Sequence, residues 1–392
     1  MSKHLISAYQ SLPVSFSKGD GIHLWDQDGG QYLDALCGIS VTSLGHNYPA
    51  VTEAIQQQAA TLLHTSNLYS IEWQQKLADL ICHLSGMDKV FFGNSGAEAN
   101  EAAIKLARLY GNKQDIKDPQ IVVMEHSFHG RTMATLSATG NRKVQAGFEP
   151  LVSGFVRAPY NDVDSIQAIA ANNKKVVAIL VEPVQGEGGI VIPDPGYLSA
   201  LREICDENNW LLMLDEIQTG IARSGKMFAF QHENIIPDVM TLAKALGNGV
   251  PIGACVTRGK AADVIQPGNH GSTFGGNPLA CRTACAVLDS ITSHNLTENA
   301  AQRSTQLVAL LREGLKGNEN LVEIRNLGLL IGIELKQNCQ ALVTDALARG
   351  LLLNVTAEKV VRLLPPLIIN EAQTAEIAEK VIACINALTL TD

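Results

Sequence analysis

The sequence contains no run of about eighteen consecutive apolar residues, the length that a helix needs to cross a lipid bilayer. It also begins without an apolar signal core or an arginine-rich transit pattern. We therefore expect a cytoplasmic protein that makes no contact with a membrane. The formal net charge is -9, with acidic and basic residues interspersed, which argues against a nucleic-acid or anionic-membrane partner.

Paired metal ligands are also missing. The eight cysteines are scattered, with no CxxC pair and no histidine at a matching spacing. They are expected to be free thiols in the core. Cys281 and Cys285 would share one face of a helix, but two such ligands without a second pair give only a weak metal signal. No metal site is therefore expected.

Several catalytic motifs are absent as well. The sequence has no P-loop, no HExxH and no GxSxG, which disfavours kinase, metalloprotease and α/β-hydrolase functions. Two glycine-rich segments, 247–253 and 186–190, match a dinucleotide-binding fingerprint only in part. Proline bars the helix that this fingerprint requires, at Pro251 in the first segment and soon after the second at Pro193. A nicotinamide oxidoreductase is therefore disfavoured.

The chain is long and rich in apolar residues, and these residues follow two kinds of secondary-structure pattern. It has 392 residues, 46% of them hydrophobic, which is enough for about two domains. In the middle of the chain, buried apolar runs such as 176–181 and 211–214 alternate with helical patterns. Such alternation predicts an α/β domain of three layers with a mainly parallel sheet.

The two ends of the chain differ from this middle part. Residues 20–36 alternate as a hairpin around a glycine turn. From about residue 279, a long amphipathic stretch that reaches Leu315 begins an α+β pattern. We predict a large domain at 66–280 and a small α+β domain at 281–392, with an N-terminal segment at 1–65 that contributes to the small domain.

Two charged residues each end an apolar run and precede a glycine-containing loop: Asp215 and Lys244. The carboxyl edge of an α/β sheet is where ligands bind, so both side chains would emerge at one crevice. An amine and an acid placed there suit an aldehyde cofactor with a pyridine ring, because the amine can form a Schiff base and the acid can hold the ring nitrogen protonated. The alternative is a surface acid and a surface lysine on unrelated loops.

A third signal lies at 93–101, where a short strand, a glycine-rich turn and a helix follow one another. Ser95 and Glu98 have the spacing of a capping box. The free N–H groups at the start of this helix suit a phosphate. An ordinary capped helix has the same pattern, so this segment alone leaves both interpretations open.

Six motifs occur together in the order found in the class III pyridoxal-phosphate aminotransferases, which the whole chain resembles. They are NSGAEANEA at 94–102, FHGR at 128–131, EPVQGEGG at 182–189, DEIQTG at 215–220, AKA at 243–245 and GSTFGGNP at 271–278. The resemblance implies fold type I, pyridoxal phosphate as the cofactor, which the large domain binds, and a homodimer with shared active sites.

The resemblance also implies roles for individual residues. Lys244 and Asp215 are the implied catalytic residues, Lys244 as the Schiff-base lysine and general base, and Asp215 as the partner of the ring nitrogen. The other implied cofactor contacts are Ser95, Gly96 and Ala97 at the phosphate, Phe128 on the ring face, Gln218 near the ring hydroxyl, and Thr273 at the phosphate of the neighbouring subunit.

The implied substrate contacts are guanidinium groups that bind carboxylates in a bidentate manner, Arg131 and Arg362. In the family, Arg362 would take the α-carboxylate of 2-oxoglutarate, and Glu187 would neutralise it when the amino donor is bound. The alternative for Arg362 is a strand residue whose head group reaches solvent. His129 is either a support for the site or a simple core histidine.

The lack of one residue type narrows the choice of amino donor. No tyrosine lies between residues 33 and 47, where the ornithine-specific members of the class place a tyrosine that contacts free ornithine. This favours an N-acylated donor, and the implied reaction moves the δ-amino group of N2-acetylornithine to 2-oxoglutarate in arginine biosynthesis. Tyr69 would line the same pocket or pack in the core.

Several alternatives remain open at this point. Another ω-aminotransferase would act on succinyldiaminopimelate, free ornithine or 4-aminobutyrate, and a protein of a different class would bind the cofactor without catalysis. The sequence does not determine the acyl group of the amino donor or whether the protein also acts in lysine biosynthesis. It also does not show whether the protein is a dimer or a tetramer, or how it is regulated.

Overall fold

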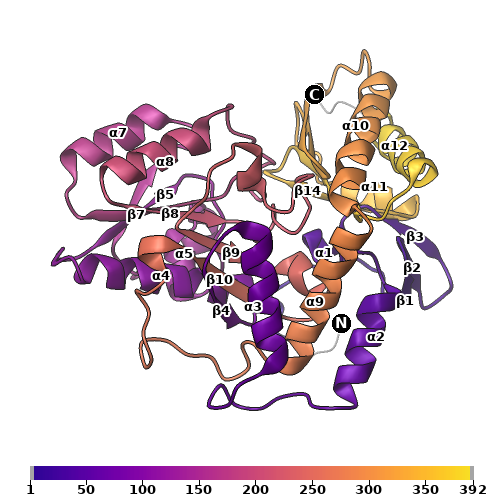
Figure 1. Ribbon diagram of the computed structural model, residues 1–392. Helices are drawn as coiled ribbons and strands as arrows, with labels where there is room; N and C mark the ends of the chain where they lie inside the picture. Colours follow the sequence, from indigo (N-terminus) through magenta and orange to yellow (C-terminus); the bar gives the residue numbers. More distant parts are fainter. Residues whose placement is uncertain (1–3, 389–392) are drawn as a thin grey trace.

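The computed structural model of the protein describes residues 4–388. The apolar runs of the middle part form a seven-stranded sheet in the order β4-β10-β9-β8-β7-β5-β6 (Figure 1). Its strands are β4 (Lys89–Gly93), β5 (Gln120–Met124), β6 (Phe155–Ala158), β7 (Val176–Val181), β8 (Leu211–Asp215), β9 (Val239–Leu242) and β10 (Gly253–Thr257). Strand β10 is antiparallel to both neighbours and the other pairs are parallel, so the prediction of a mainly parallel sheet is confirmed.

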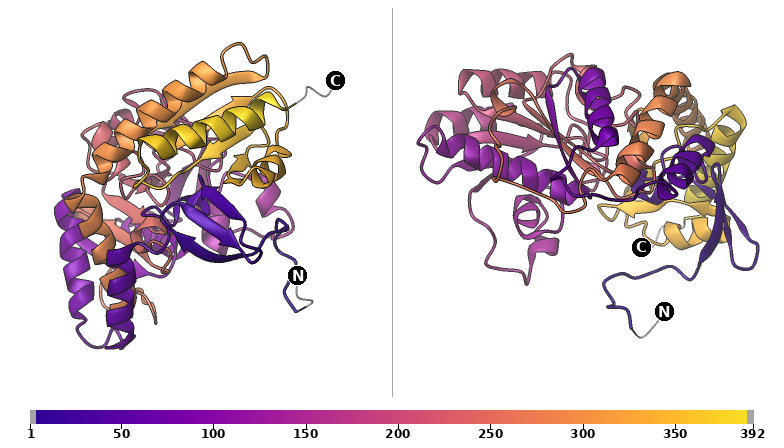
Figure 2. Two further views of the ribbon diagram at one scale, coloured as in Figure 1. Left: turned by 90° about the vertical axis from the view of Figure 1, so that its right-hand side faces the viewer. Right: turned by 60° about the horizontal axis from the view of Figure 1, so that its bottom comes forward.

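Helices cover both faces of this sheet, which explains why its central strands are apolar on both sides. Helices α7 and α8 lie against one face and α4 against the other (Figures 1 and 2). The helices of this part are α3 (Glu72–Ser85), α4 (Gly96–Asn112), α5 (Met133–Ala138), α6 (Arg142–Gln145), α7 (Val163–Asn172) and α8 (Tyr197–Glu207), with short 3-10 turns η1 (Ala229–His232), η2 (Lys244–Gly247) and η3 (Gly259–Ala261). The predicted three-layer α/β architecture is confirmed.

The C-terminal part contains a second, antiparallel sheet in the order β11-β12-β15-β14. Its elements are α10 (Leu296–Gly314), β11 (Leu321–Leu327), β12 (Leu330–Leu335), α11 (Leu342–Ala348), β13 (Leu351–Leu352), β14 (Asn354–Thr356), β15 (Val360–Leu363) and α12 (Glu371–Asn386). Helix α9 (Pro278–Ser293) leads into it from the large sheet. The amphipathic stretch from Leu279 to Leu315 forms two helices, α9 and α10, which are divided at Asn295, a residue with a left-handed backbone φ of 51°.

The N-terminal residues join this second part. Their elements are β1 (Phe16–Asp20), β2 (His23–Asp26), β3 (Gln31–Asp34), α1 (Cys37–Ser40) and α2 (Pro49–Ala59). Strand β3 pairs with β13 through Leu33 and Leu351, so the hairpin completes a sheet with the C-terminal residues. This pairing supports the proposed contribution of residues 1–65 to the small domain; residues 1–3 and 389–392 of the proposed domains lie outside the described chain.

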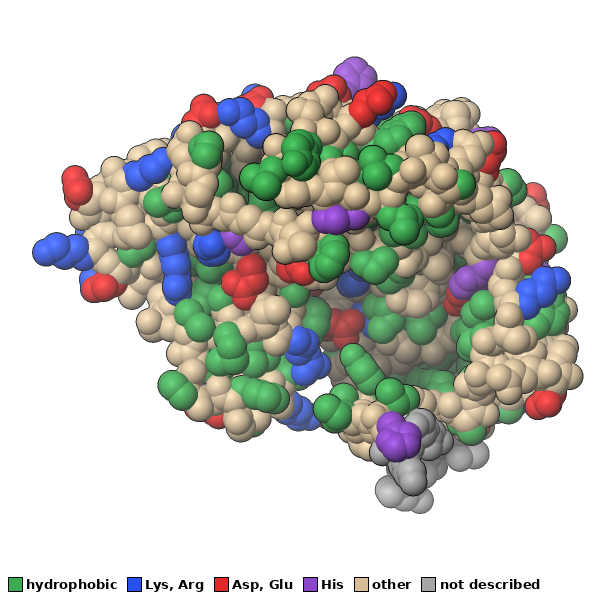
Figure 3. Space-filling view, turned by 90° about the horizontal axis from the view of Figure 1, so that it is seen from below, with side chains coloured by type: hydrophobic (Ala, Val, Ile, Leu, Met, Phe, Trp, Pro, Cys, Tyr) green, Lys and Arg blue, Asp and Glu red, His purple; other side chains and the backbone are tan. Residues whose placement is uncertain are grey.

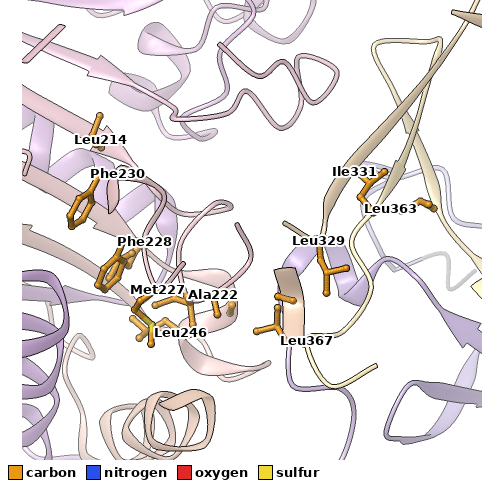
Figure 4. Packing of buried hydrophobic residues seen from close by; sticks show 14 of the residues in the cluster. Leu214, Ala222, Met227, Phe228, Phe230, Leu246, Leu329, Ile331, Leu363 and Leu367 are labelled. Carbon is orange, nitrogen blue, oxygen red and sulfur yellow. The ribbon is translucent and has the colours of Figure 1, made fainter. Parts of the chain in front are cut away.

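One hydrophobic cluster runs through both parts of the molecule. It includes Leu214 at the end of β8, Phe228 and Phe230 near η1, and Leu329 and Leu363 in the second part (Figure 4). The rings of Phe228 and Phe230 stack with centroids 5.7 Å apart. Because the cluster is continuous, the two parts share a core where they meet.

Three further features of the described residues concern membrane-spanning helices, cysteines and the shape of one face. Within residues 4–388, no helix is long and apolar enough to span a bilayer. The eight cysteines are free thiols, and all but the half-buried Cys82 are buried, as expected. Seen from below, the molecule is hollowed, and acidic and basic side chains lie in the hollow (Figure 3).

Candidate active site

A cavity of about 460 Å³ lies at the edge where the parallel strands of the large sheet end. This volume is within the usual range for small-molecule sites. The residues that line it follow five strands: Asn94 to Ala97 follow β4, Phe128 to Arg131 follow β5, Glu182 and Glu187 follow β7, Asp215 and Gln218 lie at the end of β8, and Lys244 follows β9. The structure therefore brings Asp215 and Lys244 to one cavity, whereas the alternative of unrelated surface loops is wrong.

Asp215 is 4% exposed and is held from several sides. Its Oδ1 accepts a hydrogen bond of 3.2 Å from the backbone N–H of Ile217. Its Oδ2 lies 2.8 Å from Nδ1 of His129, whose side chain is also buried. His129 thus contacts the acid of the cavity, which favours the supporting role over that of a simple core histidine.

Lys244 begins the short turn η2 with a φ of 43°. A residue with a side chain takes this left-handed conformation only when the surrounding structure enforces it. Burial lowers the pKa of the Lys244 amine, and the positive charge of Arg362 acts in the same direction, while Glu187 acts against both. A lowered pKa increases the fraction of neutral, nucleophilic amine.

The start of α4 supplies the third wall of the cavity. The Oγ of Ser95 accepts a hydrogen bond of 3.2 Å from the backbone N–H of Glu98, as the capping spacing predicts. The Glu98 carboxylate instead accepts from the N–H of Asn94, one residue earlier than a capping box requires, at 2.8 Å. A Cβ at Gly96 would lie 2.8 Å from Cδ1 of Ile217, so a larger residue there would force the Ile217 side chain to shift. This helix start suits an anion.

Glu182 is a cavity residue to which the sequence analysis gave no role. Its carboxylate accepts the backbone N–H groups of Phe128 at 3.0 Å and Gly186 at 3.3 Å. Burial raises its pKa to about 7, and the electrostatic interaction with the His129 ring acts against this shift. Glu182 ends a buried strand as Asp215 does, and this shared layout is the signal that could have identified it.

Arg362 reaches the site from β15 of the second, antiparallel sheet. Its Nη1 lies 2.7 Å from Oε1 of Glu187, and its Nε donates to Oδ1 of Asn354 at 3.1 Å. Its Nη2 is buried without a partner. Burial opposes the charged form of Glu187, but the charge and hydrogen bond of Arg362 outweigh this and lower the Glu187 pKa. The alternative of a strand residue that reaches solvent is wrong, because Arg362 is 0% exposed.

The remaining predicted residues fall into two groups. Arg131 lines the cavity, and its guanidinium lies 5.7 Å from the centre of the Phe128 ring. Thr273 and Tyr69 lie outside the cavity of their own chain, and both are exposed. The alternative of core packing for Tyr69 is wrong, because 71% of this residue is exposed.

Comparison with known proteins identifies the family. Residues 6–385 match the sequence model of the family described as aminotransferase class-III. The chain belongs to the class-III aminotransferases. It is 56% identical, over 97% of either chain, to the acetylornithine aminotransferase of Nitrosomonas europaea.

Solved structures of two class-III relatives share the fold. A crystallised ornithine aminotransferase from Toxoplasma gondii, whose structure shows partial occupancy of PLP at the active site, matches with a TM-score of 0.94 at 34% identity, covering 98% of this chain and 92% of that one. The acetylornithine aminotransferase from Elizabethkingia anophelis matches with a TM-score of 0.88, also at 34% identity, covering 98% and 97%. The predicted fold type I is confirmed.

Pyridoxal phosphate is the cofactor of class-III aminotransferases, and the cavity fits it. Three buried polar atoms at or beside the cavity have no hydrogen-bond partner among residues 4–388: Oε1 of Gln218, Nε2 of His129 and Nη2 of Arg362. Such atoms are uncommon unless a ligand completes them. An acid, an amine with a lowered pKa, an aromatic ring and a helix start are the groups that a pyridine aldehyde with a phosphate requires. No group of three or more metal-ligating side chains occurs within residues 4–388.

The shifted pKa of Lys244 predicts its reactivity in the cofactor-free protein. Reductive methylation with formaldehyde requires the neutral amine, so labelling of Lys244 should reach its half-maximal rate at a pH below 10.5, the ordinary lysine value. Glu187→Gln removes a negative charge that favours the ammonium and should move this midpoint further down, whereas the exposed Glu376→Gln should not. Mass spectrometry of the Lys244 peptide across pH measures both. An upward shift in Glu187→Gln would contradict the electrostatic account.

Proposed function

We propose that this class-III aminotransferase moves the δ-amino group of N2-acetylornithine to 2-oxoglutarate, giving N-acetylglutamate 5-semialdehyde and glutamate. The observation that carries the proposal is the meeting of Lys244, Asp215 and the Glu187–Arg362 pair at one cavity. We further propose that the reaction serves arginine biosynthesis in the cytoplasm. Bound pyridoxal phosphate supplies an aldehyde that carries the amino group and a ring that withdraws electrons from the reacting carbon.

The residues around the cavity have distinct proposed tasks. Nζ of Lys244 anchors the cofactor and later moves the proton between the two reacting carbons. The Asp215 carboxylate stabilises the protonated ring nitrogen. The remaining contacts are proposed for Phe128 over the ring, Gln218 at the ring hydroxyl, and Ser95, Gly96 and Ala97 at the phosphate.

Arg362 and Glu187 are proposed to form the device that admits two unlike substrates. With the amino donor bound, Glu187 keeps Arg362 neutralised through their 2.7 Å contact. With 2-oxoglutarate bound, Glu187 withdraws and the guanidinium takes the α-carboxylate, for which Nη2 is already unpaired. Arg131 is proposed to bind the other carboxylate of the substrates.

The choice of an acylated donor rests on two observations. The segment without tyrosine, residues 33–47, reaches the cavity through Val41, whose small side chain lines it. The identity with the Nitrosomonas europaea acetylornithine enzyme is 56%, against 34% with the Toxoplasma gondii ornithine enzyme. Both favour N2-acetylornithine over free ornithine as the amino donor.

Donor kinetics test this proposal directly. We expect kcat/KM for N2-acetylornithine to exceed those for ornithine and 4-aminobutyrate by at least about tenfold, which corresponds to about 1.4 kcal/mol. Succinyldiaminopimelate belongs in the same assay, because its acyl group distinguishes the two biosynthetic roles. Lys244→Ala is the control and should lack both turnover and the visible absorbance of the bound cofactor. A preference for ornithine would refute the proposed substrate, and an active Lys244→Ala protein would refute the proposed role of this residue.

Arg362 offers a second test, because its proposed task concerns one substrate more than the other. Arg362→Met should raise KM for 2-oxoglutarate at least about 30-fold, since removing a buried, paired guanidinium costs about 2 kcal/mol or more. The KM for N2-acetylornithine should change less. Steady-state kinetics with each substrate varied in turn measure this, and the exposed Arg349→Met is the matched control. Equal effects on both substrates would contradict the switch.

We also propose a homodimer in which each chain completes the other's site. Five hydrophobic side chains are 46% to 86% exposed on two neighbouring loops: Leu62, Leu63, Leu68, Tyr69 and Phe274. These loops are joined where Nδ2 of Asn67 donates to the carbonyls of Ser272 and Gly275. An apolar patch of this kind marks an interface. Thr273 and Tyr69 lie on the same loops, so we propose that they serve the cavity of the neighbouring chain.

Mixed dimers test the shared site. A Thr273→Ala chain and a Lys244→Ala chain, unfolded and refolded together, should form hybrids in which one cavity has both residues intact and the other has neither. At limiting pyridoxal phosphate, the mixture should therefore be more active than either variant alone. Light scattering should give twice the mass of one chain. Failure to regain activity in confirmed hybrids would overturn the proposed role of Thr273.

A further inference from the structure

Asp215 has a second side-chain partner besides His129. Nδ2 of Asn100 donates to Oδ2 of Asp215 at 2.8 Å. Asn100 is 0% exposed and lies on α4, one turn beyond Gly96 at the start of the helix. The carboxylate at the end of β8 is thus tied to the helix whose start forms the proposed phosphate end of the cavity.

The amide of Asn100 can face Asp215 in only one orientation. Nδ2 donates to two groups that only accept, the Asp215 carboxylate and the backbone carbonyl of His129, both at 2.8 Å. On the other side of the amide, Oδ1 accepts a hydrogen bond of 2.8 Å from Oγ1 of Thr241. A flipped amide would place its oxygen against two acceptors, so the three hydrogen bonds fix the side chain.

Thr241 gives this arrangement its connection to the lysine. It lies on β9, directly beside Asp215 in the parallel pairing of β8 and β9, and it is 0% exposed. Lys244 follows three residues later along the chain. The series Thr241, Asn100 and Asp215 therefore joins β9, α4 and β8, which carry the amine, the helix start and the acid of the cavity. A fully satisfied buried polar network of this kind is rigid and specific.

We propose that Asn100, oriented by Thr241, is a positioning residue for the cofactor. Its two donated hydrogen bonds hold Oδ2 of Asp215 and the backbone beside Phe128 in place, so that the acid meets the ring nitrogen while Phe128 lies over the ring. Hydrogen-bond donors also stabilise the negative charge of a carboxylate. The inference rests on the proposed function, because it takes Asp215 as the partner of the ring nitrogen.

Cofactor binding to the cofactor-free protein tests the network without reference to any substrate. Asn100→Leu keeps the approximate size of the side chain and removes its donors, and Thr241→Val removes only the hydroxyl. We expect the Kd for pyridoxal phosphate, measured by quenching of tryptophan fluorescence, to rise at least about tenfold in Asn100→Leu. It should rise by a smaller factor in Thr241→Val. The absorbance spectrum of bound cofactor across pH should change in both variants.

The double variant shows whether the two residues act in series. If Thr241 acts through Asn100, adding Thr241→Val to Asn100→Leu should leave the Kd unchanged within about twofold, because residues of one network are not additive. Thr241→Ser keeps the hydroxyl and should restore the wild-type Kd and spectrum. Thr283→Val, on α9, is the matched control, since Thr283 is 0% exposed and its hydroxyl donates to the carbonyl of Leu279 at 2.7 Å, outside the cavity.

The outcomes separate this inference from the proposed substrate. An Asn100→Leu protein with wild-type Kd and spectrum, whether or not its melting temperature falls, overturns the positioning role. If Asn100→Leu does not fold, the Kd values of Thr241→Val and Thr241→Ser for pyridoxal phosphate provide the test. Equal Kd values for these two variants overturn the positioning role. Independent, additive effects overturn the series. A wild-type protein that binds pyridoxal phosphate but does not use N2-acetylornithine overturns only the proposed substrate.

Discussion

The cavity concentrates ionisable groups out of water, and a buried charge is tolerated only with a partner. Asp215 is held by a histidine and an amide, and Glu187 and Arg362 are 2.7 Å apart. Lys244 has no comparable direct partner, and burial shifts its pKa toward the neutral form instead. A buried ionisable group either gains a partner or shifts its pKa toward the neutral form. Asp215 shows the first response and Lys244 the second. The acid is held by hydrogen-bond partners, and the lowered pKa of the amine favours its nucleophilic form.

The same requirement joins the two parts of the molecule. Glu187 lies in the loop after β7 of the large sheet, whereas Arg362 lies on β15 of the small domain. Their pairing exists only when the parts are docked, and the continuous hydrophobic cluster beneath them keeps them docked. In the proposed function, substrate recognition is therefore a property of the junction, while the proposed cofactor contacts belong mainly to the edge of the large sheet. Residues at the junction can therefore change without loss of the contacts at the edge of the large sheet, and the reverse also holds.

Much of this architecture was predictable, because it follows from patterns along the chain. Apolar runs that end on a charge placed Asp215 and Lys244 at one edge, and parallel strands made that edge common to both. The features that could not be predicted from the sequence have physical causes. A left-handed backbone at Asn295 divides the amphipathic stretch from Leu279 to Leu315 into α9 and α10. Asn100 and Thr241 are polar residues within a helix and a strand, where no local pattern shows that they meet. The role predicted for Thr273 at the site of a neighbouring subunit stays a prediction.

Lys244 is held with a φ of 43°, a conformation that costs a residue with a Cβ about 1 to 3 kcal/mol. The surrounding fold must enforce this backbone whichever side chain is present, so part of the stability of the domain is spent on the geometry of a single amine. Glycine alone would adopt it without strain. A descendant of this chain released from catalysis would therefore gain stability by replacing Lys244 with glycine. Given the proposed role of Lys244, loss of activity and a more stable fold would follow from the same change.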